Sequence, residues 1–289
     1  MADSRLLLVD GLAGAYRYFY GIRELSSKSG EPTNAVFGFI RMMQQLARQW
    51  QPTHWAVVFD GGTPPARLAL VPDYKANRKP MPDALRAQLP VLNAYLDAAA
   101  IPHLRLDACE ADDAIATLAQ AAAADGCDVL IATGDKDLFQ LVNERVRIVP
   151  VTGESVAMDA AAVREKTGVE PTQIPDWLAL TGDAADNIKG VLGVGPKTAA
   201  KLLTTWHSLE AVYARIDAVE PPKLRKTLED ARDIVTRNQH MVRLDVHVEG
   251  VGAWSTMRRV PEPMSPLRSF YERYDLHAFI NALRSPELF

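Results

Sequence analysis

The stretch VLIATGDKD, residues 129–137, decides the fold. Its first four residues are apolar and rich in β-branched side chains, which predicts a short buried strand, and Gly134 ends it. Asp135 and Asp137 follow at alternate positions, so their side chains are expected to point the same way. A polar loop with an aspartate as helix N-cap is the alternative explanation of the pair.

Two more apolar runs have the same design. Residues 5–9 lead into Asp10 and residues 55–59 into Asp60. Helical patterns lie between the runs, at 37–50, 84–100 and 112–124. This alternation predicts an α/β fold with a parallel sheet and right-handed crossovers. Ligands of such sheets bind beyond the carboxyl ends of the strands, where these aspartates fall.

A second region begins near Thr167 and reads as helices separated by Gly and Pro turns. Helices are expected at 174–181 and 197–206, with the loop TGDAADN and a glycine-rich segment between them and strand character only at 246–250. We therefore divide the chain into an α/β domain, 1–165, and a helical domain, 166–289.

Nine acidic residues stand where strands or helices should begin or end. Carboxylates crowded together resist ionising unless hard divalent cations neutralise them. Each block also has a simpler explanation: CEADDA could complement a helix dipole, and TGDAADN could shape an Asx turn. Taken together they predict a metal centre, with these candidate ligands: Asp10, Asp60, Glu110, Asp112, Asp113, Asp135, Asp137, Asp183 and Asp186.

Composition is that of an ordinary globular protein, with 48% hydrophobic and 24% charged residues. The net charge of −4 comes from 36 acids and 32 bases; without the nine acids, 27 remain against 32, or +5. Net charge therefore does not exclude a polyanionic partner. No apolar run could span a bilayer, and two cysteines without metal-ligand spacing favour a reducing cytoplasm.

The segment KGVLGVGPKTA, residues 189–199, is not a phosphate-binding P-loop, because Pro196 separates Gly195 from Lys197. It fits a hairpin between two helices, near 180–203. We expect Gly193 and Gly195 to allow close backbone approach and Pro196 to start the second helix. Backbone N–H groups there could bind nucleic-acid phosphate, and a tight helix connection is the alternative. The candidate DNA-binding residues are Gly190, Gly193, Gly195, Lys197 and Thr198.

A basic stretch, PDYKANRKP at 72–80, places Tyr74, Lys75 and Arg78 at helical spacing. A solvated basic helix explains such a run, and so does a site where the aromatic ring stacks on a terminal base while the cations hold a phosphate.

These blocks, in their order along the chain, resemble the bacterial 5′-nuclease and flap-endonuclease family, which includes the N-terminal nuclease domain of DNA polymerase I. The resemblance runs from about Leu6 to Ala200 and more weakly to Phe279. It is carried by LVDG, GEPTNAVFGF, AVVFDGG, YKANR, EADD, TGDKD, GDAADN and GVLGVGPKTA.

The resemblance implies a PIN-like nuclease domain with a helical arch, followed by a helical domain with a helix-hairpin-type DNA-binding motif. It implies two Mg²⁺ or Mn²⁺ ions, about 4 Å apart, held by the nine acids. It gives catalytic roles to Lys75 and Arg78 at the scissile phosphate, to Tyr74 stacking near the displaced nucleotide, and to Arg17 close to the site.

By the same resemblance, residues 77–91 would form the arch through which a free 5′ end passes. The hairpin would offer backbone carbonyls to K⁺, those of Leu180, Thr181, Lys189, Val191 and Val194. Lys189 stands where polymerase-linked members usually have proline, a change that could strengthen a phosphate contact or only alter the turn.

The expected function is a monomeric 5′-3′ exonuclease and flap endonuclease of DNA replication and repair, cutting DNA with flaps, nicks or free 5′ ends. The chain would be a stand-alone enzyme or an excised domain. A PIN-type ribonuclease would share the carboxylates without needing the glycine hairpin. The intact acid set argues against a non-catalytic DNA-binding homologue, and Leu12 argues against a haloacid-type phosphatase, which needs a second aspartate there.

Overall fold

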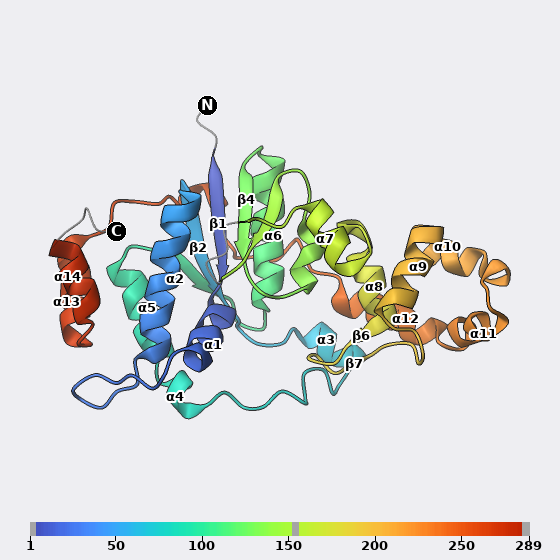
Figure 1. The fold of residues 1–289 in the computed structure, drawn as a ribbon, viewed down its shortest axis with the longest axis horizontal. Coiled ribbons are helices and arrows are strands. Elements are labelled where there is room, and N and C mark those ends of the chain that lie inside the picture. The colour runs from blue at the N-terminus through green and yellow to red at the C-terminus, as the bar shows by residue number, and fades with distance from the viewer. Residues whose placement is uncertain (1–3, 152–155, 285–289) are drawn as a thin grey trace.

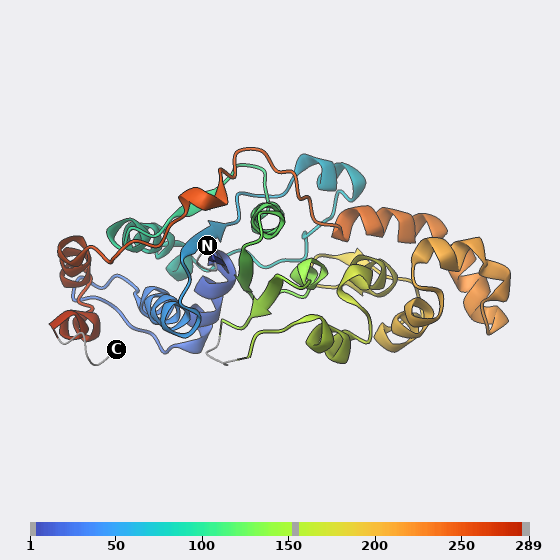
Figure 2. The same ribbon diagram turned by 90° about the horizontal axis from the view of Figure 1, so that it is seen from above.

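A computed structural model describes residues 4–151 and 156–284 of the chain. It is elongated, with a sheet domain at one end and a group of helices at the other (Figures 1 and 2). Among the described residues, no helix is long and apolar enough to cross a membrane.

The centre of the sheet domain is a five-stranded parallel sheet in the order β3-β2-β1-β4-β5. Its strands are β1 (Arg5–Asp10), β2 (His54–Phe59), β3 (His103–Arg105), β4 (Asp128–Ala132) and β5 (Val146–Val149). β1 pairs in register with both neighbours, Val9 lying opposite Val57 and Ala132. Asp10 and the residues that follow β2 and β4 therefore emerge at one edge of the sheet.

Helices cover both faces of this sheet, which explains why its central strands are apolar on both sides. Leu6 and Leu8 pack with α6 (Ala111–Ala124), while Leu7 and Val9 face the layer of α2 (Asn34–Trp50) and α5 (Leu89–Ala98). The remaining elements of this domain are α1 (Gly11–Gly21), α3 (Pro65–Leu70), α4 (Asp83–Arg86), the 3-10 helix η1 (Asp137–Leu141) and α7 (Ala160–Thr167).

The second group of elements is helical apart from one short hairpin. β6 (Gly182–Asp183) and β7 (Ile188–Lys189) form that hairpin. The helices are α8 (Ile174–Thr181), α9 (Pro196–Trp206), α10 (Leu209–Ala214), α11 (Pro222–Asp230) and α12 (Arg232–Val242). The bounds of α8 match the expectation, whereas residues 246–250 form turns and not a strand.

The chain then returns along the sheet domain to its far end (Figure 1). On the way, Met257 accepts a backbone hydrogen bond from Trp55 at 2.9 Å, and Arg259 donates one to Thr53 at 2.9 Å. Helices α13 (Met264–Arg273) and α14 (His277–Arg284) then pack on the α2 and α5 layer through Tyr271 and other apolar side chains. This part of the expected helical domain, 166–289, thus lies on the sheet domain.

The expected helical arch, residues 77–91, is helical only in part: it contains α4 and the start of α5, whereas residues 77–82 are not helical. Between α3 and α4 the chain runs as turns and extended backbone along one side of the molecule (Figure 1). Pro72, Pro80 and Pro82 interrupt the segment, and a proline removes the N–H that a continuous helix needs. Lys75 has φ +58°, a left-handed conformation incompatible with a helix, so the helical spacing of Tyr74, Lys75 and Arg78 is coincidental.

Candidate metal centre

The nine predicted acids come from strand ends, a helix start and the hairpin. Asp10 ends β1, Asp60 follows β2, and Asp135 and Asp137 follow β4. Glu110 precedes α6, Asp112 and Asp113 lie in its first turn, and Asp183 and Asp186 lie in the β6–β7 hairpin.

Six of these residues gather around one cavity of about 360 Å³ or directly beside it. Oxygens of Asp137, Asp183 and Asp186 lie within 4.8 Å of one another. Asp10, Asp135, Asp183 and Asp186 line the cavity, and Asp112 lies close enough to Asp10 and Asp135 to feel their charge. A shared position for hard cations accounts for such crowding.

Burial and mutual repulsion change how these groups ionise. Burial, followed by the nearby charges of Asp135 and Asp60, raises the pKa of Asp10 to about 6, against hydrogen bonds from Ala13 and Thr133 that lower it. Burial and the neighbouring carboxylates hold the pKa values of Asp112 and Asp137 well above the usual range. Such shifts are typical of functional sites.

The chemistry of this donor set fits divalent metal. Within residues 4–151 and 156–284, Asp137 Oδ1 is buried and accepts no hydrogen bond. A buried carboxylate oxygen without a partner is costly, and a cation with oxygen ligands would satisfy it.

Basic side chains partly neutralise the cluster. Lys75 Nζ lies 2.8 Å from Glu110 Oε1 and 3.8 Å from Asp186 Oδ2, and Arg78 pairs with Asp186 Oδ1. Lys136 Nζ lies 3.2 Å from Asp183 Oδ2. Lys136 is not among the residues predicted from the sequence, although it lies between two of the predicted acids.

Tyr74 does not lie where stacking would require it. Its side chain is buried, and its hydroxyl lies 3.0 Å from Asp186 Oδ2 and 3.2 Å from Glu110 Oε2. Burial, followed by the charges of these two acids, raises the pKa of Tyr74. In this arrangement Tyr74 acts as a hydrogen-bond donor to the carboxylates. Arg17 is exposed on α1 and lines a separate cavity with Thr133 and Gly134, directly after β4.

Asp113 points away from the cluster. Consecutive helical residues are about 100° apart, so the side chains of Asp112 and Asp113 leave α6 in different directions. Both oxygens of Asp113 accept hydrogen bonds from Arg67, at 2.7 and 2.8 Å, and the backbone N–H of Asp245 donates to one of them at 2.9 Å. The expectation that all three acids of EADD converge on metal therefore disagrees with this geometry.

The hairpin joins the metal centre to α9. Gly182 and Gly190 make the close approach here: a Cβ on Gly182 would lie 2.3 Å from the nitrogen of Gly190. This was expected of Gly193 and Gly195, but the space beside both is open. Gly193 is instead needed for its φ of +80°. Pro196 does begin α9, and Lys197 is exposed in its first turn.

Three of the five carbonyls expected to hold K⁺ already accept hydrogen bonds. Leu180 accepts one from Val191, Val191 from Val194, and Lys189 from the buried side chain of Asn238 at 2.8 Å. A carbonyl has two lone pairs, so a cation site there stays a prediction.

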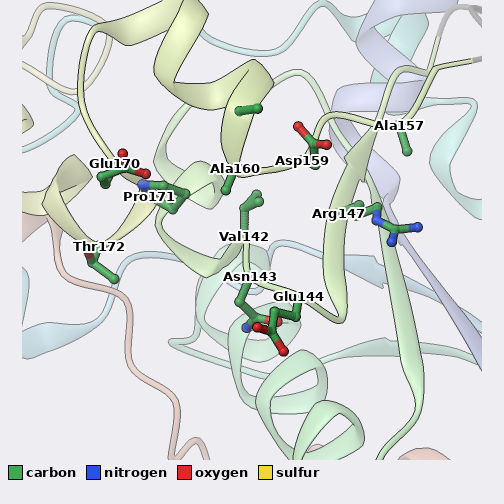
Figure 3. Close-up of a pocket in the computed structure, with 11 residues that line it drawn as sticks. Val142, Asn143, Glu144, Arg147, Ala157, Asp159, Ala160, Glu170, Pro171 and Thr172 are labelled. Carbon is green, nitrogen blue, oxygen red and sulfur yellow. The ribbon is translucent and has the colours of Figure 1, made fainter.

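A larger hollow, of about 800 Å³, lies between β5, α7 and the loop before α8 (Figure 3). Glu144, Arg147 and Asp159 line it together with apolar residues, and none of the nine predicted acids does. Chemistry, and not size, therefore identifies the functional cavity.

Comparison with known proteins gives the same picture. The family model described as 5'-3' exonuclease, N-terminal resolvase-like domain, matches residues 5–168, and that described as 5'-3' exonuclease, C-terminal SAM fold, matches 169–262. A 5'-3' exonuclease of Aquifex aeolicus is 42% identical over 78% of this chain and 78% of its own. DNA polymerase I of Pseudomonas aeruginosa is 44% identical over 78% of this chain but only 25% of its own length.

Solved structures of similar fold include a bacteriophage T5 flap endonuclease in a complex with DNA and metal ions. It is 21% identical with a TM-score of 0.71, over 96% of this chain and 99% of that one. The catalytic core of Rad2 in complex with DNA substrate is 18% identical with a TM-score of 0.65, and the match covers 98% of this chain and 92% of that one. These likenesses confirm the expected fold, a parallel-sheet domain followed by a helical one. By the family models and the identity to its relatives, the chain belongs to the 5′-3′ exonuclease family.

Proposed function

We propose that this protein is a metal-dependent, structure-selective 5′-nuclease that hydrolyses phosphodiester bonds of DNA with 5′ flaps, nicks or free 5′ ends. The observation that carries the proposal is the convergence of acids from two strand ends, α6 and the hairpin on one cavity beside Lys75 and Arg78. Family membership and the DNA complexes of proteins with this fold support it.

Asp10, Asp60, Glu110, Asp112, Asp135 and Asp137 would hold one or both of two Mg²⁺ or Mn²⁺ ions. Asp183 and Asp186 would complete the second position, which the grouping of their oxygens with Asp137 supports. When bound, such a pair of ions activates water and stabilises the leaving oxygen. With the acids neutralised, Lys75 and Arg78 would lose their present partners and become free to bind the scissile phosphate.

The loop that follows the β6–β7 hairpin would, together with the start of α9, hold duplex DNA at a fixed distance from the cut. The open space beside Gly193 and Gly195 leaves room for a phosphate, and Lys197 and Thr198 lie at the start of α9. A helix N-terminus favours anions. We further propose that the protein acts as a monomer in the cytoplasm during DNA replication and repair; its two cysteines are both free thiols.

The test is a cleavage panel of flap, nicked, overhang, single-stranded and structured-RNA substrates, with Mg²⁺ and with chelator. Wild type should cut 5′-flap DNA in Mg²⁺ only. Asp135→Asn should abolish cleavage while largely sparing DNA binding, whereas Asp128→Asn, at a half-buried position on β4 outside the cluster, should remain active. Cleavage by Asp135→Asn in Mg²⁺ would contradict the assignment, and preferential RNA cleavage would replace the DNA function with a ribonuclease.

A further inference from the structure

Arg67 occupies an unusual position for a cation beside a metal centre. It lies on α3 with its guanidinium almost fully buried. Nη1 lies 2.7 Å from both Glu110 Oε2 and Asp113 Oδ2, and Nη2 lies 2.8 Å from Asp113 Oδ1. Arg67 therefore fixes the orientation of Glu110, which pairs with Lys75 through its other oxygen.

The same group of side chains is attached to the helical domain. Nη2 of Arg67 reaches the carbonyl of Arg243 at 3.4 Å, and the N–H of Asp245 binds Asp113 at 2.9 Å. Both residues directly follow α12, whose buried Asn238 donates to the carbonyl of Lys189 in the hairpin. A continuous path of hydrogen bonds and one rigid helix thus joins the hairpin to Glu110.

We infer that Arg67 and Asp113 are positioning residues, which hold Glu110 in its metal-binding orientation and connect it to the helical domain. The inference rests on the proposed function and changes the expected role of Asp113, whose two oxygens are occupied by the arginine. A planar guanidinium makes two parallel hydrogen bonds to a carboxylate, which a lysine cannot reproduce. Residues that orient a metal ligand typically change metal affinity 10- to 100-fold when replaced.

The test is a double-mutant cycle read on Mn²⁺ binding by calorimetry, with no DNA present. Arg67→Lys and Asp113→Asn should each weaken binding at one of the two metal positions by about tenfold. Because both act through one arrangement, the double variant should bind no more weakly than the weaker single variant. Losses that multiply in the double variant would show Asp113 to be a ligand in its own right and would overturn the inference.

Thr117→Val is the matched control. The Thr117 hydroxyl also attaches the segment after α12 to α6, through the N–H of Val248 at 3.1 Å and the carbonyl of Asp245 at 3.4 Å. It donates to the backbone carbonyl of Asp113 at 2.9 Å, but it makes no hydrogen bond to the side chains of Arg67, Glu110 or Asp113. It should keep wild-type Mn²⁺ affinity, and an equal loss in this variant would overturn the inference. Thermal melts verify folding, and if Asp113→Asn does not fold, Asp113→Glu takes its place in the cycle under the same criterion.

A kinetic readout supplements the cycle. Arg67→Lys should lower kcat about tenfold while DNA affinity measured in chelator stays within twofold of wild type. Loss of DNA affinity with unchanged kcat would overturn the inference by assigning Arg67 to substrate binding. Failure of the proposed function itself would appear separately, as a wild type that binds Mn²⁺ and cuts no DNA; a wild type that binds no Mn²⁺ would overturn both.

Discussion

At the level of single residues, the charge of the acidic centre is partly balanced by the protein's own cations. Lys75, Arg78 and Lys136 each lie against a carboxylate that we assign to metal. The balance is incomplete, because Asp10 and Asp112 have no cation at ion-pair distance in the described chain and both have raised pKa values. The centre therefore stores repulsion that bound metal would relieve.

Asp10→Asn should stabilise the protein in chelator at pH 7 by about 3 kcal/mol, the free energy that corresponds to the rise in the pKa of Asp10 from 3.8 to about 6. Asp10 has a folded-state pKa of about 6, above its unfolded value. Its contribution to the stability of the folded state is therefore fully present below about pH 4 and is lost as the pH rises through 6. Asparagine can still accept the cap hydrogen bond from Ala13. Urea unfolding in chelator at pH 4 and pH 7 measures this. An equal effect at both pH values would contradict it.

Lys75→Ala should lower kcat by about 10²- to 10³-fold, because it removes a positive charge placed to stabilise the transition state. Lys79→Ala is the matched control, since Lys79 lies exposed in the same loop. Single-turnover cleavage of flap DNA in Mg²⁺ separates the two variants. Equal rates for Lys75→Ala and Lys79→Ala would remove Lys75 from the catalytic centre.

At the level of elements, the hairpin and the start of α9 form a unit whose glycines have different tasks. Gly182 and Gly190 let two backbone segments touch, whereas Gly193 supplies a left-handed turn. Leu192, in the turn between β7 and α9, is 92% exposed.

Lys197→Ala should weaken duplex binding and lower the slope of log affinity against log salt by about 1, the loss of one phosphate contact. Lys226→Ala, which removes another exposed lysine, one paired with Asp230 on α11, should keep the slope. Fluorescence anisotropy between 50 and 200 mM salt, about the range over which such contacts weaken strongly, gives both values. Identical slopes for the two variants would exclude Lys197 from the phosphate contacts.

The sequence predicted those elements whose patterns are local. The apolar runs that lead to Asp10, Asp60 and Asp135 were enough to find β1, β2 and β4, and glycine and proline signals gave α8 and α9. β3 and β5 were missed because they are short, with only three and four residues. The turn around Lys75 could not be predicted either, since its conformation depends on the backbone carbonyl of Asp186, 111 positions along the chain.

Which charged side chains pair with each other also depends on contacts between residues that are far apart in the sequence. The alternate spacing of Asp135 and Asp137 after β4 correctly predicted that the two lie near each other. Nothing in the local sequence, however, shows that Asp113 pairs with Arg67 while Asp112 lies near Asp10. The helical period offered one usable signal, because adjacent residues of α6 diverge by about 100°.

At the level of the whole molecule, the C-terminal helices complete the core of the sheet domain. Tyr271 is 1% exposed and packs beside Phe270 and Phe279.

Tyr271→Ala should lower the free energy of unfolding by about 3 kcal/mol, as for other large aromatic truncations. Met264→Ala, at a position 52% exposed on the same helix, should cost little. Equilibrium urea unfolding compares them, and a cost below about 1 kcal/mol for Tyr271→Ala would show that the layer does not depend on these helices.

The route of the chain also has a consequence for biosynthesis. A nascent polypeptide that has emerged only as far as the end of α12 already contains the sheet and the helices on its two faces. The apolar surface of α2 and α5, however, still lacks α13 and α14, which cover it. Proteins made from the N-terminus fold as their segments appear, and uncovered apolar surface attracts chaperones or other nascent chains. The nuclease centre would therefore be assembled early on the ribosome, and the molecule would become resistant to aggregation only when residues 264–284 emerge.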